Sequence, residues 1–154
     1  MTLGEPLDPR HNSDMLANAT DLEAVKQFAS QTTRSVLITR RKDGGLQSSP
    51  MSVVVDDDGN VLTATRARNA KTYNLARDPR ATLCLFNEQW PGPWMHVEGE
   101  AEIERLPDAM PLLADYYARR GQDTTTDAFR ERMLTENRVL IRVRLQRVVR
   151  PAAR

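Results

Sequence analysis

Residues 61–87, VLTATRARNAKTYNLARDPRATLCLFN, contain two strand-like runs on either side of one short helical segment. The runs VLTATR (61–66) and ATLCLFN (81–87) are rich in β-branched and apolar residues, which is typical of strands. The helix between them must end near Asp78, because Pro79 disfavours helical geometry in the residue before it. This strand–helix–strand unit is the centre from which we interpret the rest of the chain.

Cations cluster where that helix is expected to begin. A helix N-terminus carries unpaired N–H groups and about half a positive charge, so a nearby cation costs roughly 0.3–1 kcal/mol in an empty protein. Arg66, Arg68 and Lys71 make sense at this place if an anion such as phosphate binds there. Asn69 fits as the N-cap, and Thr72 adds a hydroxyl. The alternative is a chance cluster of ordinary surface cations, since the chain has 22 basic residues.

Composition narrows the class of protein. The chain has 154 residues and a formal net charge of +1, which suits one globular domain and gives no general reason to expect nucleic acid or a membrane surface as partner. No apolar run approaches the roughly 20 residues of a membrane helix, and no signal peptide is visible, so we expect the cytoplasm. The single cysteine, Cys84, excludes an intramolecular disulfide and fits a small buried apolar residue. Two histidines and one cysteine provide no metal-ligand spacing.

Two regions follow from the polarity pattern. Residues 1–19 are polar and without periodicity, so we expect a flexible arm. Residues 20–150 form the domain. Its first helix is expected at about 21–30, with Thr20 and Glu23 as a capping box.

Turn signals divide the remaining chain into hairpin-linked strands with inserted helices. The expected strands are 35–41, 48–57, 61–66, 81–87, 94–104 and 138–149, and further helices are expected at 108–120 and 127–137. Hairpin connections favour an antiparallel sheet, and six strands often close on themselves to protect their edges. The predicted fold class is therefore mainly β with α insertions, a six-stranded antiparallel barrel.

The last two expected strands carry opposite charge on their polar faces. Glutamates alternate with apolar residues in 94–104, and arginines do so in 138–149. Cross-strand Glu–Arg pairs stabilise antiparallel neighbours, so we predict that the two strands are adjacent or nearly so. The alternative is that both faces are only solvated, because exposed ion pairs are weak.

The order of these motifs resembles the pyridoxamine 5′-phosphate oxidase-like family. The resemblance runs from SSPMSVVVDDDGNVLTAT through RNAKTYNLARDPRATLCLF to MHVEGEAEIE and covers residues 20–149. It implies an FMN-binding-like split β-barrel that is homodimeric and binds a flavin or a deazaflavin.

Within this family the residues are closer to the branch that uses the deazaflavin coenzyme F420. In the FMN branch, cations hold the phosphate at the positions of Met51 and Asp56, a serine stands at Asn69, and the chain ends in an Arg-Leu-x-Pro segment that is absent here. The F420 branch shows T-x-x-x-R-x-K-x-x-N-L-x-x-D-P-R. Lys71 matches this pattern, whereas Arg68 is displaced by one residue from the usual arginine.

The resemblance implies the site residues. The ring would lie along Ser49, Pro50, Met51 and Ser52, the phosphate would be near Thr65, Arg66, Arg68, Lys71 and Thr72, and Trp94 would come from the other subunit. His96 is a candidate proton donor, although a histidine at such a position is more often a hydrogen-bonded surface residue. Tyr116 or Tyr117 could also supply a proton, although both suit packing.

The expected function is an F420-dependent oxidoreductase that transfers a hydride between reduced deazaflavin and a small unsaturated or quinone-like substrate. One alternative is an FMN-dependent oxidase or reductase of the same fold. Others are a non-catalytic flavin- or F420-binding protein and a small-anion-binding module without cofactor. The sequence does not name the substrate.

Overall fold

The computed structural model describes residues 16–151. The predicted arm, residues 1–19, falls mostly on residues 1–15, which lie outside the described part. The elements of the described part, in chain order, are α1 (Ala19–Ala29), β1 (Arg34–Arg40), β2 (Leu46–Ser52), β3 (Val54–Val55), β4 (Val61–Arg66), α2 (Ala70–Arg77), β5 (Arg80–Phe86), β6 (Trp94–Glu104), α3 (Met110–Arg119), α4 (Asp127–Thr135) and β7 (Arg138–Val149).

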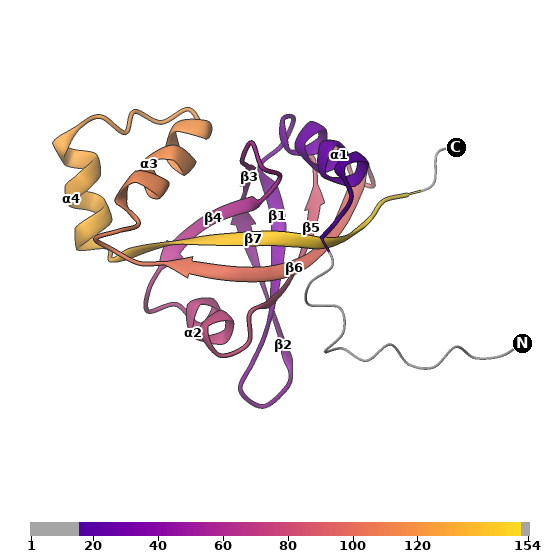
Figure 1. The fold of residues 1–154 in the computed structure, drawn as a ribbon, viewed down its shortest axis with the longest axis horizontal. Coiled ribbons are helices and arrows are strands. Elements are labelled where there is room, and N and C mark those ends of the chain that lie inside the picture. The colour runs from indigo at the N-terminus through magenta and orange to yellow at the C-terminus, as the bar shows by residue number, and fades with distance from the viewer. Residues whose placement is uncertain (1–15, 152–154) are drawn as a thin grey trace, which may run out of the picture.

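All strands belong to one antiparallel sheet with the order β2-β1-β5-β6-β7-β4-β3. The sheet curls into a half-barrel, with the long strands β6 and β7 running across the others (Figure 1). The helices α3 and α4 lie together beyond one end of β6 and β7, while α1 and α2 lie on opposite sides of the curl. The mainly β, antiparallel expectation is therefore confirmed.

The sheet has seven strands rather than the predicted six. The run 48–57 divides at Val53, whose backbone N–H donates to the Thr33 carbonyl at 2.8 Å and whose side chain is fully buried. As a result β2 pairs with β1, while β3 pairs with β4 on the other edge of the sheet. The sequence pattern shows only one apolar run here, because the division of the strand depends on a hydrogen bond to the Thr33 carbonyl, which is distant in sequence.

The charged strands β6 and β7 are neighbours, as predicted. Glu100 lies opposite Arg144 and Glu102 opposite Arg142. Gly99 lies at a register shift between the two strands, and a Cβ at this position would overlap the Arg144 carbonyl. The glycine is therefore needed for the close approach of the two backbones.

The first helix begins differently from the prediction. The N-cap is Asn18, whose Oδ1 accepts a hydrogen bond from the Asp21 N–H at 2.8 Å, so the Thr20–Glu23 capping box is wrong. Just before this cap, the Ala17 N–H donates to the Leu145 carbonyl at 3.0 Å and so joins the chain to β7. None of the helices in the described residues is long and apolar enough to cross a membrane.

Two hydrophobic cores share the strands β4 and β7. The first fills the half-barrel beneath α1 and includes Val61 and Ile141. The second lies under α3 and α4 and includes Leu62 and Leu140. Because adjacent residues of β4 and β7 point to opposite faces, both strands contribute to both cores. Packing against β4 and β7 therefore places α3 and α4 at the end of the sheet where α2 begins.

Candidate functional site

The N-terminus of α2 is left without the usual side-chain cap. Asn69 is the N-cap residue, as predicted, but its Nδ2 donates to Thr65 Oγ1 at 2.8 Å and its side chain caps no helical N–H. The buried Thr72 hydroxyl donates to the Arg66 carbonyl at 3.1 Å. The first turn has no acidic residue. The positive end of the helix dipole is therefore not balanced by the helix itself.

Lys71 adds a second positive charge at this end. Burial lowers the pKa of the Lys71 ammonium, and the nearby Arg138 guanidinium lowers it further. Arg138 Nε lies 2.6 Å from Glu136 Oε2, and Arg66 lies 3.7 Å from the other oxygen of the same carboxylate. Lys71 itself makes no ion pair within residues 16–151. Two arginines thus share one carboxylate while Lys71 has none, which leaves an excess of positive charge.

A cavity of about 310 Å³ adjoins this cluster. Its wall combines the end of β2 with residues from β4, β7 and the α3–α4 region. The residues that define it here are Met51, Ser52, Arg120, Arg132, Glu136 and Arg138, and we call it the basic cavity. Three arginines face one glutamate, so the cavity suits an anionic group.

Aromatic rings hold the arginines of α3 and α4 in place. The Arg132 guanidinium lies 5.3 Å from the centre of the Tyr117 ring, and Arg132 Nη2 donates to Gln122 Oε1 at 3.2 Å. Arg120 lies 5.6 Å from the centre of the Tyr116 ring. Stacking of this kind orders a guanidinium without neutralising its charge. Both arginines therefore remain available to an anion.

The two tyrosines are packing residues of the second core, which is the role that the sequence favoured for them. The Tyr116 hydroxyl donates to the Ser52 carbonyl at 2.9 Å, and burial raises the pKa of this phenol. Tyr116 therefore stays protonated at neutral pH and fixes the end of β2 beside the basic cavity.

The structure brings together part of the predicted site. Pro50, Met51 and Ser52 line the basic cavity, and Arg66 and Lys71 adjoin it through Glu136 and Arg138. Other predicted residues lie nearby without facing that cavity: Ser49 is half-buried in β2, Arg68 is exposed before α2, and Thr65 and Thr72 are buried in internal hydrogen bonds.

Trp94 and His96 lie elsewhere. Both belong to β6, where Trp94 is 41% exposed and His96 Nε2 lies 3.0 Å from Glu98 Oε1. His96 stands opposite Cys84, on the outer face of the sheet. Neither residue lines the basic cavity, so any part they have in the site stays a prediction.

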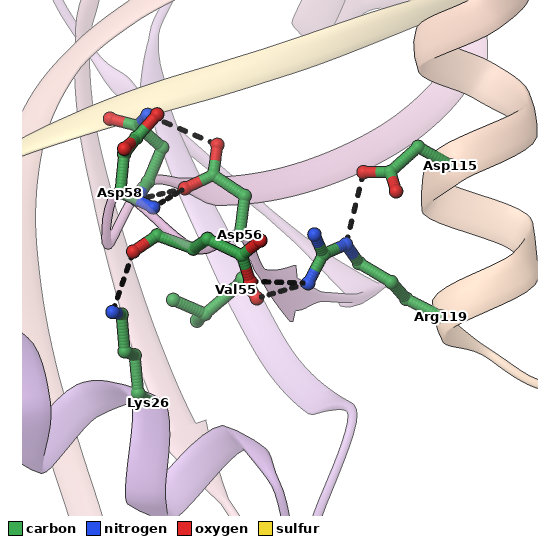
Figure 2. A network of polar contacts seen from close by, with 8 residues as sticks. Lys26, Val55, Asp56, Asp58, Asp115 and Arg119 are labelled. Carbon is green, nitrogen blue, oxygen red and sulfur yellow. Dashed lines mark hydrogen bonds and ion pairs between the residues drawn. The ribbon is translucent and has the colours of Figure 1, made fainter.

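The two positions that carry phosphate-binding cations in the FMN branch have other tasks here. Met51 packs against the first core. The Asp56 carboxylate accepts hydrogen bonds from the N–H groups of Asp58 and Asn60 at 3.0 and 2.9 Å and so closes the β3–β4 turn, as Figure 2 shows. Neither side chain can attract a phosphate.

Sequence reasoning missed the α3–α4 contribution to the site. The sequence predicts only two helices and a connection between residues 108 and 137, the segment that contributes Arg120, Arg132 and Glu136. The available signal is the pair Arg119–Arg120, which follows Tyr116–Tyr117 after one residue. This local pattern does not indicate which other element of the fold the arginine side chains contact.

Comparison with known proteins places these features in a family. The family model described as pyridoxamine 5′-phosphate oxidase matches residues 22–149. A conserved hypothetical protein of Mycobacterium tuberculosis is 26% identical and matches 88% of this chain and 85% of its own, with a TM-score of 0.67. An F420 reductase is 19% identical over 80% of this chain and 94% of its own, with a TM-score of 0.61. General Stress Protein 26 of Bacillus anthracis is 18% identical over 84% and 92%, also with a TM-score of 0.61.

Proposed function

The chain belongs to the pyridoxamine 5′-phosphate oxidase family, and from this premise we propose that it is a cytoplasmic F420-dependent oxidoreductase. When bound, the reduced deazaflavin supplies a hydride for a small unsaturated or quinone-like substrate. The chain's own residues bind and orient the cofactor and exclude water from its ring.

One observation carries the proposal. Lys71 is half-buried at the uncapped N-terminus of α2, beside Arg138 and without a carboxylate partner within the described residues. An arrangement that is unfavourable in the empty protein becomes favourable when a phosphate accepts hydrogen bonds from the helix N–H groups and from Lys71. We assign the cofactor phosphate to this position.

The charge distribution supports F420 over FMN. The strand that would hold an FMN phosphate has Met51 at one bracketing position and Asp56 at the other, and Asp56 is bound within its own turn. The basic cavity adds Arg120 and Arg132, which is more positive charge than one phosphate needs. A cofactor with a phosphate and several tail carboxylates would use both groups of cations. The resemblance to a solved F420 reductase agrees with this choice, although at 19% identity it shows the fold alone.

We also propose that the active form is a homodimer built on the outer face of the sheet. Val36 lies opposite Pro50 and Cys84 in neighbouring strands, and Cys84 lies opposite His96. Val36, Cys84 and His96 are only partly covered in the single chain. A partly exposed apolar face of a sheet is a common interface, and pairing would bring Trp94 of one subunit toward the other.

A second candidate is a protein that stores or shields the cofactor without turnover. The observation in its favour is that the Tyr116 hydroxyl, the phenol beside the basic cavity, is committed to the Ser52 carbonyl and has a raised pKa. Tyr117, which also lines the basic cavity, packs in the second core, so a proton would then have to come from water.

Titration of the purified protein with F420 and with FMN, followed by ring fluorescence, tests the proposal. We expect F420 to bind and FMN to bind much more weakly or not at all. The loaded protein is then assayed with quinones, nitroaromatic compounds and unsaturated ketones. Preference for FMN would reject the cofactor assignment, and F420 binding without turnover of any compound would favour storage.

A further inference from the structure

A second, larger cavity lies beside the α1–β1 connection. It has a volume of about 800 Å³, within the usual range of small-molecule sites. It is bounded by the α1–β1 connection, β3, the β5–β6 loop and the end of α3, and we call it the large cavity. Its uncharged lining includes Ala29, Val54 and Val55 on the apolar side and Gln31, Asn87 and Gln89 on the polar side.

The large cavity is connected to the strand that the proposed function assigns to the cofactor ring. Arg34 lines the large cavity and also a smaller one of about 350 Å³. The smaller cavity is lined by Pro50, Met51 and Ser52, which also border the basic cavity. A ring placed along this part of β2 would therefore adjoin the basic cavity and, past Arg34, the large cavity.

The two cavities differ in how their charges are paired. In the large cavity, Arg34 Nη2 lies 2.9 Å from Glu88 Oε1, and Arg119 Nε lies 3.0 Å from Asp115 Oδ2. Lys26 Nζ donates to the Asp57 carbonyl at 2.6 Å, and the Asp57 carboxylate lies 3.5 Å from Arg119. Figure 2 shows Lys26 and Arg119 reaching the β3–β4 turn from opposite sides. Both arginines thus have carboxylate partners and Lys26 is bound to a backbone carbonyl, whereas Arg120 and Arg132 of the basic cavity have no carboxylate partner within the described residues.

We propose that the large cavity binds the substrate of the oxidoreductase, and that this substrate is an uncharged molecule with an apolar body and carbonyl oxygens. This inference rests on the proposed function for the position of the ring. A neutral ligand leaves the ion pairs at the rim intact, while the valines cover its body and the amide side chains donate to its oxygens. A charged ligand would have to compete with partners that these cations already have.

Binding of a matched pair of probes to the cofactor-free protein tests the proposal. Menadione is neutral, and naphthoquinone sulfonate has the same ring system with one negative charge. The readout is quenching of tryptophan fluorescence, corrected for absorbance, because the exposed Trp90 follows Gln89 in the β5–β6 loop. We expect saturable quenching by menadione, with an affinity roughly tenfold or more above that of the sulfonate.

Variants identify the place of binding. Ser30→Phe puts a bulky ring at the wall of the large cavity and should weaken menadione binding about tenfold. Gln27→Phe, in the last turn of α1 but outside that wall, should leave it unchanged. Glu88→Lys removes the partner of Arg34 and should reduce or reverse the preference for the neutral probe.

Linear quenching without saturation, equal affinity in Ser30→Phe, or tighter binding of the sulfonate to the unmodified chain would each overturn the inference. The F420 titration is independent of these measurements. A protein that binds F420 but not menadione refutes only the substrate site. One that binds menadione but not F420 refutes only the cofactor assignment.

Discussion

The helices α1 and α2 begin in opposite ways. At α1, Asn18 caps the helix with its side chain, and Asp21 adds a negative charge to the first turn. At α2, Asn69 occupies the same position but turns its side chain to Thr65, and the charge of the first turn is that of Lys71. The first N-terminus is satisfied by its own residues, and the second lacks the acceptor and the negative charge that an anion would supply. A helix N-terminus whose own residues leave its positive charge unbalanced can therefore identify an anion-binding site.

The largest effect is expected when Lys71 is removed. Lys71→Ala should weaken F420 binding by about 1.5–3 kcal/mol, because a charge-assisted hydrogen bond is lost. The stability of the empty protein should stay unchanged or rise, since a half-buried cation without a carboxylate partner is gone. Fluorescence titration and thermal unfolding measure the two quantities.

Lys42→Ala, in the exposed β1–β2 turn, is the matched control and should change neither. Unchanged F420 affinity in Lys71→Ala would remove this lysine from the site and end the contrast between the two helices.

The cap of α1 should matter for stability alone. Asn18→Ala is expected to destabilise the fold by about 1 kcal/mol, because the Asp21 N–H loses its side-chain partner. F420 affinity should be that of the unmodified chain. Chemical denaturation and the cofactor titration check the two statements, and a loss of affinity would mean that the two N-termini are not independent.

A smaller effect is expected when the first turn of α2 is made to resemble that of α1. Ala70→Asp places a carboxylate near the helix N-terminus and should stabilise the empty protein by roughly 0.3–1 kcal/mol. The same charge should compete with the phosphate and weaken F420 binding. Stabilisation together with tighter F420 binding would contradict the assignment of this N-terminus to an anion.

The smallest expected effect is a change of protein stability and of F420 affinity at alkaline pH. Burial and Arg138 lower the pKa of Lys71 in the folded, empty protein. Between this lowered pKa and the ordinary lysine value, the unfolded chain binds more protons than the folded one, so the stability of the empty protein rises with pH. F420 affinity should fall across the same window, because the anion prefers protonated Lys71. Titrations at increasing pH measure this, and Lys71→Ala should abolish the fall.

The sequence predicted most of the fold where the signal was local. The strands β6 and β7 have the predicted bounds, because strict alternation and charge define both of them. The division at Val53 could not be seen, because it depends on the Thr33 carbonyl, which is remote in sequence. The predicted start of α1 is wrong because Asn18 and Thr20 are both good N-cap residues, and tertiary contacts determine which of the two caps the helix.

The candidate site was predictable only in part for the same reason. The cluster around Lys71 was visible because its residues are neighbours in sequence. Arg120 and Arg132 reach the end of β2 through the packing of α3 and α4, and Arg138 through the pairing of β7 with β4, and no local pattern encodes either. Long-range placement also explains why Trp94 and His96 could be assigned to the site by resemblance and yet lie away from the basic cavity.

The strands β4 and β7 belong to both hydrophobic cores, with Leu62 and Leu140 on one side and Val61 and Ile141 on the other. Neither core can open without exposing one face of these two strands. The chain should therefore unfold in one cooperative transition, without a separate melting of α3 and α4. In amide hydrogen exchange, the slowest-exchanging protons should lie in β4 and β7.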